Sequence, residues 1–315
     1  MFDAESFVKE QIAIVRERIE GNAIIACSGG VDSTVAAAIV NEAIGERLLT
    51  IYVDTGLMRK GETDEVKAML EDIGLNFKIV DASDDFFKAL EGVIDPEEKR
   101  KAIGERFIRV FEKEAKAFDA RFLVQGTIAP DWIESGDEFR DTIKSHHNVG
   151  GIPEEMELEL VEPLRDLYKD EVRVVARHLG VKVSERQPFP GPALAIRIIG
   201  EVSRENVEIV RNACHIVEDE MEIAANKGIM DLPWQFFAAL LPVQSVGVHG
   251  DARVYGKTIV VRAVKSIDGM SAAYSRIPHE ILERISVRIT NEMKAQVNRV
   301  VYDITNKPPG TIEWE

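Results

Sequence analysis

The sequence predicts an α/β domain built on a parallel sheet, followed by a smaller α+β domain. In the first half, apolar runs of strand length alternate with amphipathic segments of helical spacing. This alternation is typical of a parallel sheet with helices on both faces. Residues 187–192 then bring three prolines and one glycine within six positions, which no helix or central strand tolerates. We therefore place the domain border there, with residues 1–186 and 187–315 as the two domains.

The first half supplies the elements of the parallel sheet. Apolar, β-branched runs predict strands at 23–27, 48–53, 77–80 and 122–125. Apolar residues at helical spacing predict helices at 5–20, 33–44, 62–73 and 95–118. The last of these helices opens with Asp95 and Pro96, an N-cap followed by proline at the first helical position.

The second half mixes the two kinds of element. We expect short strands at 195–199, 243–248, 258–264 and 299–304, and long helices at about 203–227 and 278–296. Strands and helices that follow no βαβ alternation indicate a small α+β domain.

Composition excludes several classes of function. The chain has 315 residues, of which 45% are hydrophobic and 30% charged, as in ordinary globular proteins. A formal net charge of −16 disfavours sequence-independent nucleic-acid binding, which needs clustered Lys and Arg. No apolar run reaches the length of a membrane span, and the acidic start at residues 1–5 is unlike a signal peptide. Two cysteines form no disulfide framework, so we expect a cytoplasmic protein.

The most informative motif lies between the first expected strand and the helix that follows it. It reads Ser28, Gly29, Gly30, Val31, Asp32, Ser33 and Thr34. Glycines let backbone N–H groups approach an anion, and a helix N-terminus adds unpaired donors and partial positive charge. The turn has neither the Gly-Lys-Ser/Thr ending of a P-loop nor the third glycine of a dinucleotide fingerprint. It therefore suits a released pyrophosphate better than a transferred γ-phosphoryl group. The plainer alternative is a glycine-rich turn that caps a helix.

Other polar residues follow neighbouring expected strands. Asp54 ends the second strand, and Gly126 and Thr127 follow the fourth. Ligands of parallel sheets bind at the carboxyl ends of the strands, so we expect these residues and the loop 28–34 to line one crevice.

The pattern Ser-Gly-Gly-x-Asp-Ser resembles the signature of the N-type ATP pyrophosphatases, which cleave ATP between its α and β phosphates. The chain also carries the segments IKSHHNVGG (143–151), FPGP (189–192), SVGVHGD (245–251), RVVYD (299–303) and KPPGTIEWE (307–315). Together these segments closely resemble the synthetase part of the GMP synthase family along essentially the whole chain. The resemblance implies an adenine nucleotide α-hydrolase-like fold for the first domain and a dimerisation and XMP-binding role for the second.

The activity implied by this resemblance is the conversion of XMP to GMP. ATP adenylates the C2 oxygen of the purine with release of pyrophosphate, and ammonia then displaces AMP. Esterification with AMP turns a poor leaving group into a good one, and the protein must keep water away from the intermediate. The implied ligands are ATP and Mg²⁺.

The resemblance also assigns roles to single residues near the loop. It implies catalytic roles for Asp32, Asp131 and Lys144, with Asp32 as the Mg²⁺ ligand. Asp32 could instead cap the helix, and Asp131 could cap a turn. Lys144, His146 and His147 belong to a segment that forms a lid in the family. The two histidines then order the lid or contact substrate, or they are simply solvated.

For XMP, the resemblance points to six residues outside the loop. They are Arg100, Gln235, Asp251, Lys307, Ile312 and Glu313. A nucleotide monophosphate needs Arg and Lys, and purine N–H groups and ribose hydroxyls need carboxylate and amide partners. Arg100 could instead belong to a solvated helix face, and the last residues could form a frayed tail. We expect the tail to be docked instead, with Trp314 as a buried apolar anchor.

The resemblance also predicts partners. Cys27 lies in an expected strand and Cys214 in an expected helix, neither within a nucleophile motif, so the chain has no glutaminase site of its own. A separate glutaminase subunit is therefore implied as the ammonia source, together with a homodimer formed by the second domain. The rival interpretations are a NAD synthetase, a tRNA thiolase and a non-catalytic ATP-sensing module.

Overall fold

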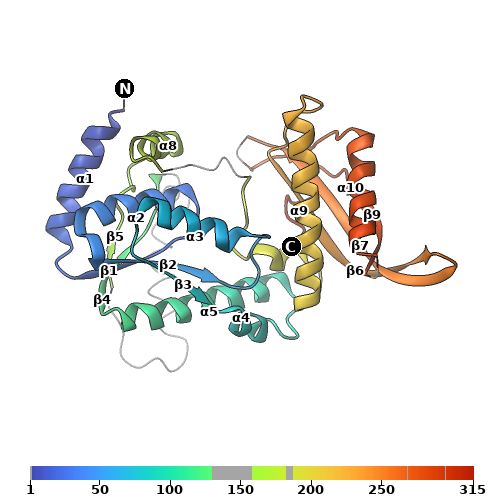
Figure 1. Ribbon diagram of the computed structural model, residues 1–315, viewed down its shortest axis with the longest axis horizontal. Helices are drawn as coiled ribbons and strands as arrows, with labels where there is room; N and C mark the ends of the chain where they lie inside the picture. The colour runs from blue at the N-terminus through green and yellow to red at the C-terminus, as the bar shows by residue number, and fades with distance from the viewer. Residues whose placement is uncertain (1, 130–157, 182–186, 268, 295) are drawn as a thin grey trace. The chain divides into compact units, whose positions relative to one another are not determined.

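The structure is a computed structural model that describes residues 2–129, 158–181, 187–267, 269–294 and 296–315 (Figure 1). The chain forms two compact units, and neither is a single stretch of sequence. Unit 1 comprises Met1–Asp54, Thr63–Asp81 and Phe107–Glu185. Unit 2 comprises Thr55–Glu62, Ala82–Arg106 and Arg186–Glu315. This grouping reflects contacts, whereas the predicted border at 186/187 divides the chain by function and stays a prediction.

Unit 1 is built on a five-stranded sheet. Its strands are β1 (Asn22–Ala26), β2 (Leu48–Asp54), β3 (Phe77–Asp81), β4 (Ala120–Val124) and β5 (Glu159–Val161). Its helices are α1 (Ala4–Arg18), α2 (Val31–Ile44), the 3₁₀ turn η1 (Gly45–Arg47), most of α3 (Glu62–Ile73), the second half of α5 (Pro96–Ala117), and α8 (Lys169–His178). The four expected strands and four expected helices of this half are confirmed within a few residues.

All pairings in this sheet are parallel, in the order β3-β2-β1-β4-β5. The predicted α/β class is therefore confirmed. The strand order reverses between β1 and β4, because the chain first builds outward on one side of β1 and then on the other. Such a reversal is the place where open α/β sheets bind ligands, beyond the carboxyl ends of the strands.

Local sequence explains why these elements form. Asp3 caps α1 by accepting hydrogen bonds from the backbone N–H groups of Glu5 and Ser6, at 3.1 and 3.2 Å. Strand β2 is buried along almost its whole length, as expected for a strand covered on both faces. Helices α1, α2 and α8 pack against one another on one face of the sheet, and α5 runs along the other (Figure 1).

Unit 2 contains a four-stranded sheet and two long helices. Its strands are β6 (Gln235–His249), β7 (Ala252–Lys265), β8 (Ala273–Tyr274) and β9 (Val297–Asp303). Its helices are α4 (Ser83–Ala89), the first half of α5, the 3₁₀ helix η3 (Ala193–Arg197), α9 (Arg204–Asn226) and α10 (His279–Glu292). β6 and β8 are antiparallel to β7, and β9 is parallel to it. The predicted α+β class is confirmed.

Two expectations for unit 2 need correction. The strand expected at 195–199 is wrong, because Ala193–Arg197 form η3. The strand expected at 243–248 is only the end of the 15-residue strand β6. Helix α9 packs against β6, and α10 packs against α9 and β9. Within the described residues, no helix combines the length and apolar character that crossing a membrane requires.

Candidate functional site: an anion-binding loop and a clamped tail

The segments that follow β1, β2 and β4 meet at the carboxyl edge of the parallel sheet. β1 pairs with β2 on one side and with β4 on the other, so the loop 28–34 lies between Asp54 and the segment that contains Gly126 and Thr127. The Asp54 carboxylate accepts a 2.7 Å hydrogen bond from the Thr63 hydroxyl at the start of α3. The expected grouping of these residues along one edge is therefore observed.

The loop is shaped to present backbone donors. Gly29 has a φ of +79°, a conformation that glycine adopts without strain. Gly30 is the N-cap of α2 and provides no side-chain hydrogen bond to the first turn. The Thr34 hydroxyl donates instead to the Gly30 carbonyl, at 2.8 Å, and the Ser33 hydroxyl to the same oxygen, at 3.2 Å. The first N–H groups of α2 are thus left for a ligand, which makes this turn an anion site.

The segment after β4 comes into close contact with this loop. A Cβ atom added to Gly126 would lie 2.8 Å from the backbone carbon of Asp32 and 2.8 Å from the backbone nitrogen of Ser33. Real side chains essentially never make such contacts with backbone atoms. Glycine at 126 is therefore required for the two segments to approach each other at the strand-order reversal.

Asp32 lies in the first turn of α2 with its carboxylate mostly buried. Lys169, at the start of α8, places its ammonium group 3.4 Å from the Asp32 carboxylate. The carboxylate is 27% exposed, so solvent and a ligand can reach it. Among the described residues, no cluster of three or more His, Cys, Asp or Glu side chains is arranged to hold a metal ion. One carboxylate beside an anion site suits Mg²⁺, which takes few protein ligands when phosphates supply the rest.

Three of the residues predicted for XMP lie together in unit 2. Glu313 accepts hydrogen bonds from Arg197, at 3.1 and 2.9 Å, and from the Gln235 amide, at 2.7 Å. Ile312 precedes Glu313, and its carbonyl accepts a 2.9 Å hydrogen bond from the buried Arg262. Sequence reasoning missed Arg197 and Arg262.

The tail ends on a second buried cation. Lys99 on α5 is fully buried and forms an ion pair with Glu315. Burial lowers the pKa of Lys99, and the Glu315 carboxylate opposes that shift. Trp314 is 38% exposed, so its expected role as a buried anchor is wrong. Carboxylates rather than the aromatic ring hold the tail in place.

The other residues predicted for XMP lie apart from this cluster. Arg100 forms an ion pair with Glu97 on its own helix and is partly exposed. The Lys307 ammonium donates to the Gly269 carbonyl, at 2.8 Å. Asp251 is exposed in the turn between β6 and β7, whereas Gln235 begins β6. A 15-residue strand separates its two ends by about 45 Å.

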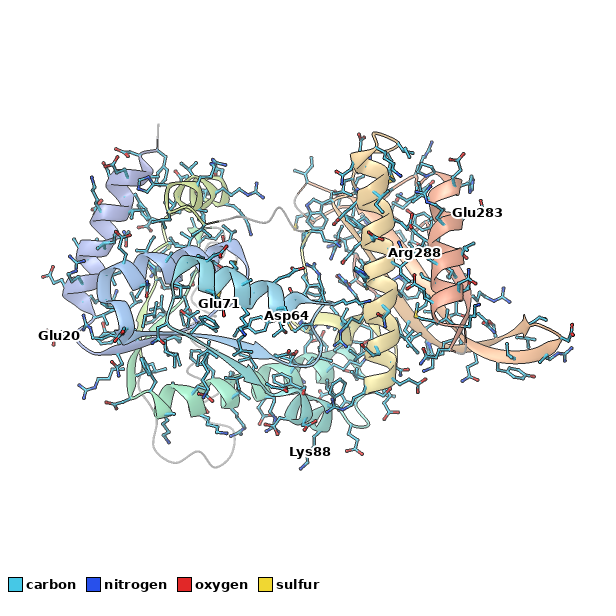
Figure 2. The ribbon with its side chains drawn as sticks, in the orientation of Figure 1. Glu20, Asp64, Glu71, Lys88, Glu283 and Arg288 are labelled. Carbon is cyan, nitrogen blue, oxygen red and sulfur yellow. The ribbon has the colours of Figure 1, made fainter. Side chains whose placement is uncertain are left out.

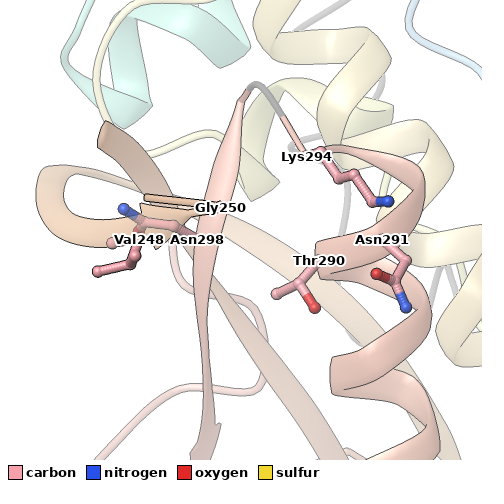
Figure 3. A pocket seen from close by; sticks show the side chains of 7 residues that line it. Val248, Gly250, Thr290, Asn291, Lys294 and Asn298 are labelled. Carbon is pink, nitrogen blue, oxygen red and sulfur yellow. The ribbon is translucent and has the colours of Figure 1, made fainter. Parts of the chain in front are cut away.

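A surface hollow lies next to this turn (Figure 3). Its lining residues come from β6, the turn, the end of α10 and β9, and they are Gly247, Val248, Gly250, Thr290, Asn291, Lys294 and Asn298. Asp251 is the only predicted site residue that adjoins it in sequence among those the structure describes.

Asp131, Lys144, His146 and His147 lie outside the described residues, so their assigned roles stay predictions.

Comparisons with known proteins define first the class and then the family. A family model described as NAD synthase matches residues 3–127, which contain the loop 28–34 and the strands on both sides of it. The chain therefore has the nucleotide-binding domain of the ATP pyrophosphatase class. A second model, described as GMP synthase C terminal domain, matches residues 222–314.

Relatives match over the full chain. The B subunit of glutamine-hydrolyzing GMP synthase from Methanopyrus kandleri is 56% identical over 100% of both chains. The protein of the same name from Thermoplasma acidophilum is 54% identical over 96% of both. The glutamine-hydrolyzing GMP synthase of Clostridium botulinum is 54% identical over 98% of this chain and 61% of its own length. The chain belongs to the GMP synthase family.

Proposed function

We propose that this chain is the synthetase subunit of a two-subunit GMP synthase, a carbon–nitrogen ligase. ATP adenylates the C2 oxygen of XMP with release of pyrophosphate, and ammonia then displaces AMP to give GMP. The observation that carries the proposal is the full-length match to relatives named as one separate subunit of this enzyme. The longer Clostridium botulinum relative, of which this chain spans 61%, supports a glutaminase on a separate chain here.

We assign ATP binding to the carboxyl edge of the parallel sheet. The loop 28–34, Asp54, Gly126 and Thr127 are the proposed contacts, and the donors at the start of α2 suit the pyrophosphate. Asp32 would hold Mg²⁺ beside the phosphates. A bound Mg²⁺ would neutralise charge on the departing pyrophosphate.

We assign XMP binding to unit 2. Arg100 and Lys307 suit the monophosphate because both are cations, and Glu313 suits a purine N–H because a carboxylate accepts hydrogen bonds. Gln235 and Ile312 lie beside Glu313 and complete the proposed set within one chain. Asp251, at the far end of β6, would reach an XMP site only as the contribution of a second copy in a homodimer.

The remaining proposals concern the segment 130–157 and the setting of the enzyme. Asp131 and Lys144 would act on the reacting groups, and His146 and His147 would belong to the lid that covers them. The cytoplasm is the proposed compartment, which agrees with two free, buried cysteines at positions 27 and 214.

One assay tests the proposed function. The purified chain is supplied with ATP, Mg²⁺, XMP and an ammonium salt, and AMP, pyrophosphate and GMP are measured together. We expect the three products in equal amounts. We expect glutamine to replace the ammonium salt only when a glutaminase subunit is added.

The rival interpretations predict other results. Turnover of deamido-NAD in place of XMP would support a NAD synthetase, which the family model at residues 3–127 keeps as the second candidate. Bound ATP without any product would indicate a sensing module. Formation of ADP and inorganic phosphate would refute cleavage between the α and β phosphates.

A further inference from the structure

Two fully buried cations in unit 2 hold alternate residues of the tail. Arg197 binds Glu313 and Lys99 binds Glu315, and both cations have 0% side-chain exposure. Trp314, between the two glutamates, turns outward and is 38% exposed. Buried charges are costly unless they are paired and hydrogen-bonded, so these contacts are specific rather than incidental surface pairs.

The Arg197 guanidinium fixes the orientation of the Glu313 carboxylate. Its Nε lies 3.1 Å from Oε2 and its Nη2 lies 2.9 Å from Oε1, so the two planar groups meet as a two-pronged fork. The guanidinium itself stacks 4.2 Å from the Phe237 ring centre and 5.1 Å from that of Phe189. Burial works to lower the pKa of Arg197, and the Glu313 carboxylate more than offsets it, so the pKa is raised.

The geometry leaves Glu313 able to accept one more hydrogen bond. An ionised carboxylate offers about four acceptor positions. Arg197 occupies two of them, and the Gln235 amide, at 2.7 Å from Oε1, occupies a third. The carboxylate is therefore immobilised without being saturated. A purine N–H is a donor of the kind that the remaining position would accept.

Lys99 joins the same arrangement from a distant part of the chain. Its ammonium group donates to the carbonyl of Ile198, at 2.7 Å, immediately after Arg197, and forms the ion pair with Glu315. The other Glu315 oxygen accepts a 3.3 Å hydrogen bond from the Gly200 N–H. Lys99 thus connects α5, which also carries Arg100, to the segment that holds Arg197 and to the tail.

We propose that Arg197 and Lys99 are positioning residues that fix Glu313 for recognition of the purine ring of XMP. Neither residue contacts substrate. Arg197 orients the carboxylate directly, and Lys99 fixes the tail two residues further on, through Glu315. This inference rests on the proposed function, because it takes XMP as the ligand of unit 2.

The test compares three variants in the ammonia-dependent assay. Arg197→Lys keeps the charge and removes the fork. Glu315→Gln removes the distant ion pair without altering Glu313, and Glu315→Asp keeps its charge. Lys101→Met is the matched control, since Lys101 is an exposed lysine on the same helix, paired with Glu98. The Michaelis constants for XMP and ATP are measured separately for each.

We expect Arg197→Lys and Glu315→Gln to raise the KM for XMP about tenfold or more, with the KM for ATP changed less than about twofold. A factor of ten corresponds to about 1.4 kcal/mol of lost binding free energy. Glu315→Asp should recover part of the loss, and Lys101→Met should leave both constants unchanged. Thermal unfolding and far-UV circular dichroism of each variant show whether it folds; if Arg197→Lys does not, Glu315→Gln decides.

The outcomes separate this inference from the proposed function. A wild-type chain that does not convert XMP refutes the proposed function. A wild-type chain that converts XMP, with folded variants whose KM for XMP is unchanged, overturns the positioning role alone. Equal increases in the KM for both substrates, or a loss of stability with unchanged kinetics, would also overturn it and indicate a purely structural ion pair.

Discussion

Gly126 is the residue at which the segment after β4 touches the backbone of the anion-binding loop. We expect Gly126→Ala to displace Asp32 and Ser33, because the new methyl group would lie 2.8 Å from their backbone atoms. The N–H donors at the start of α2 would then no longer converge on one anion. The KM for ATP should rise about tenfold or more, the cost of roughly 1.4 kcal/mol of misplaced contacts, with little change in the KM for XMP. Steady-state kinetics with each substrate varied in turn measures both effects.

Gly104 offers the matched control for this substitution. It lies inside α5, and a Cβ added there would meet no atom within 4 Å. Gly104→Ala should therefore leave both Michaelis constants unchanged and stabilise the helix by about 0.5–1 kcal/mol. Unchanged ATP kinetics in Gly126→Ala would show that the loop tolerates the added methyl group, and the close approach would then have no bearing on nucleotide binding.

At the scale of residues, the sequence reveals the short-range features and hides the long-range ones. The loop 28–34 is contiguous, so its chemistry can be read directly from the chain. Arg197 and Glu313 are 116 positions apart, and Lys99 and Glu315 are 216 apart. No local pattern announces such pairs, because a lysine or arginine that will be buried looks like any exposed one. The expectation of a buried Trp314 fails for the converse reason: its large apolar ring is conspicuous in the sequence, whereas the two flanking carboxylates make the contacts.

Helices α9 and α10 are joined by a set of ion pairs centred on the nearly buried Glu220. Arg288 on α10 lies toward α9 (Figure 2) and contacts both Asp219 and Glu220, and Arg284 also contacts Glu220. We expect Arg288→Met to lower the free energy of unfolding by about 1–2 kcal/mol, because Glu220 loses one of its two cationic partners. Equilibrium unfolding in urea measures the change.

The pH dependence of this loss distinguishes the ion pair from simple packing. Burial works to raise the pKa of Glu220, but the hydrogen bonds from Arg284 and Arg288 outweigh it, so its pKa is lowered from 4.5. A carboxyl group with a lowered pKa stabilises the fold above its unfolded-state pKa and loses that contribution as the pH falls. The penalty of Arg288→Met should therefore be largest near neutral pH and shrink below about pH 4.5. Lys9→Met, which removes an exposed pair with Glu5, should cost less than about 0.5 kcal/mol. A penalty that is the same at pH 4 and pH 7 would contradict the electrostatic explanation.

At the scale of elements, the alternating first half is predictable because each apolar run there is bounded by turn residues. The failures lie where burial and backbone geometry disagree. Residues Ala193–Arg197 are all buried and resemble a strand in composition. Ala193, however, has a φ of +55° directly after Pro192, and the chain turns into a 3₁₀ helix. The strand expected at 243–248 begins only after Pro242, but the pairing of β6 with β7 shifts between Leu241 and Gln244, and such a bulge accommodates the proline within one long strand.

The two compact units coincide with the two proposed binding roles. Every described residue proposed for ATP lies in unit 1, and every described residue proposed for XMP lies in unit 2. Arg100 shows why sequence order could not reveal this. It lies in the first third of the chain, yet residues 82–106 pack with the second half, where Lys99 meets the tail. A linear border cannot express a unit assembled from three separate segments.

This division predicts how each ligand will protect the backbone from hydrogen exchange. A non-hydrolysable ATP analogue with Mg²⁺ should slow exchange in peptides that cover the loop 28–34 and residues 125–128. XMP alone should slow exchange in peptides around Arg197, at the start of β6 and in residues 307–315, because a ligand that binds only the folded tail suppresses its local opening. The two sets of peptides belong to different units, so mass spectrometry can resolve them in one experiment. Protection of the loop 28–34 by XMP alone, with an unprotected tail, would place the purine in unit 1. The tail would then be a structural strap, since its buried cations would be satisfied without any ligand nearby.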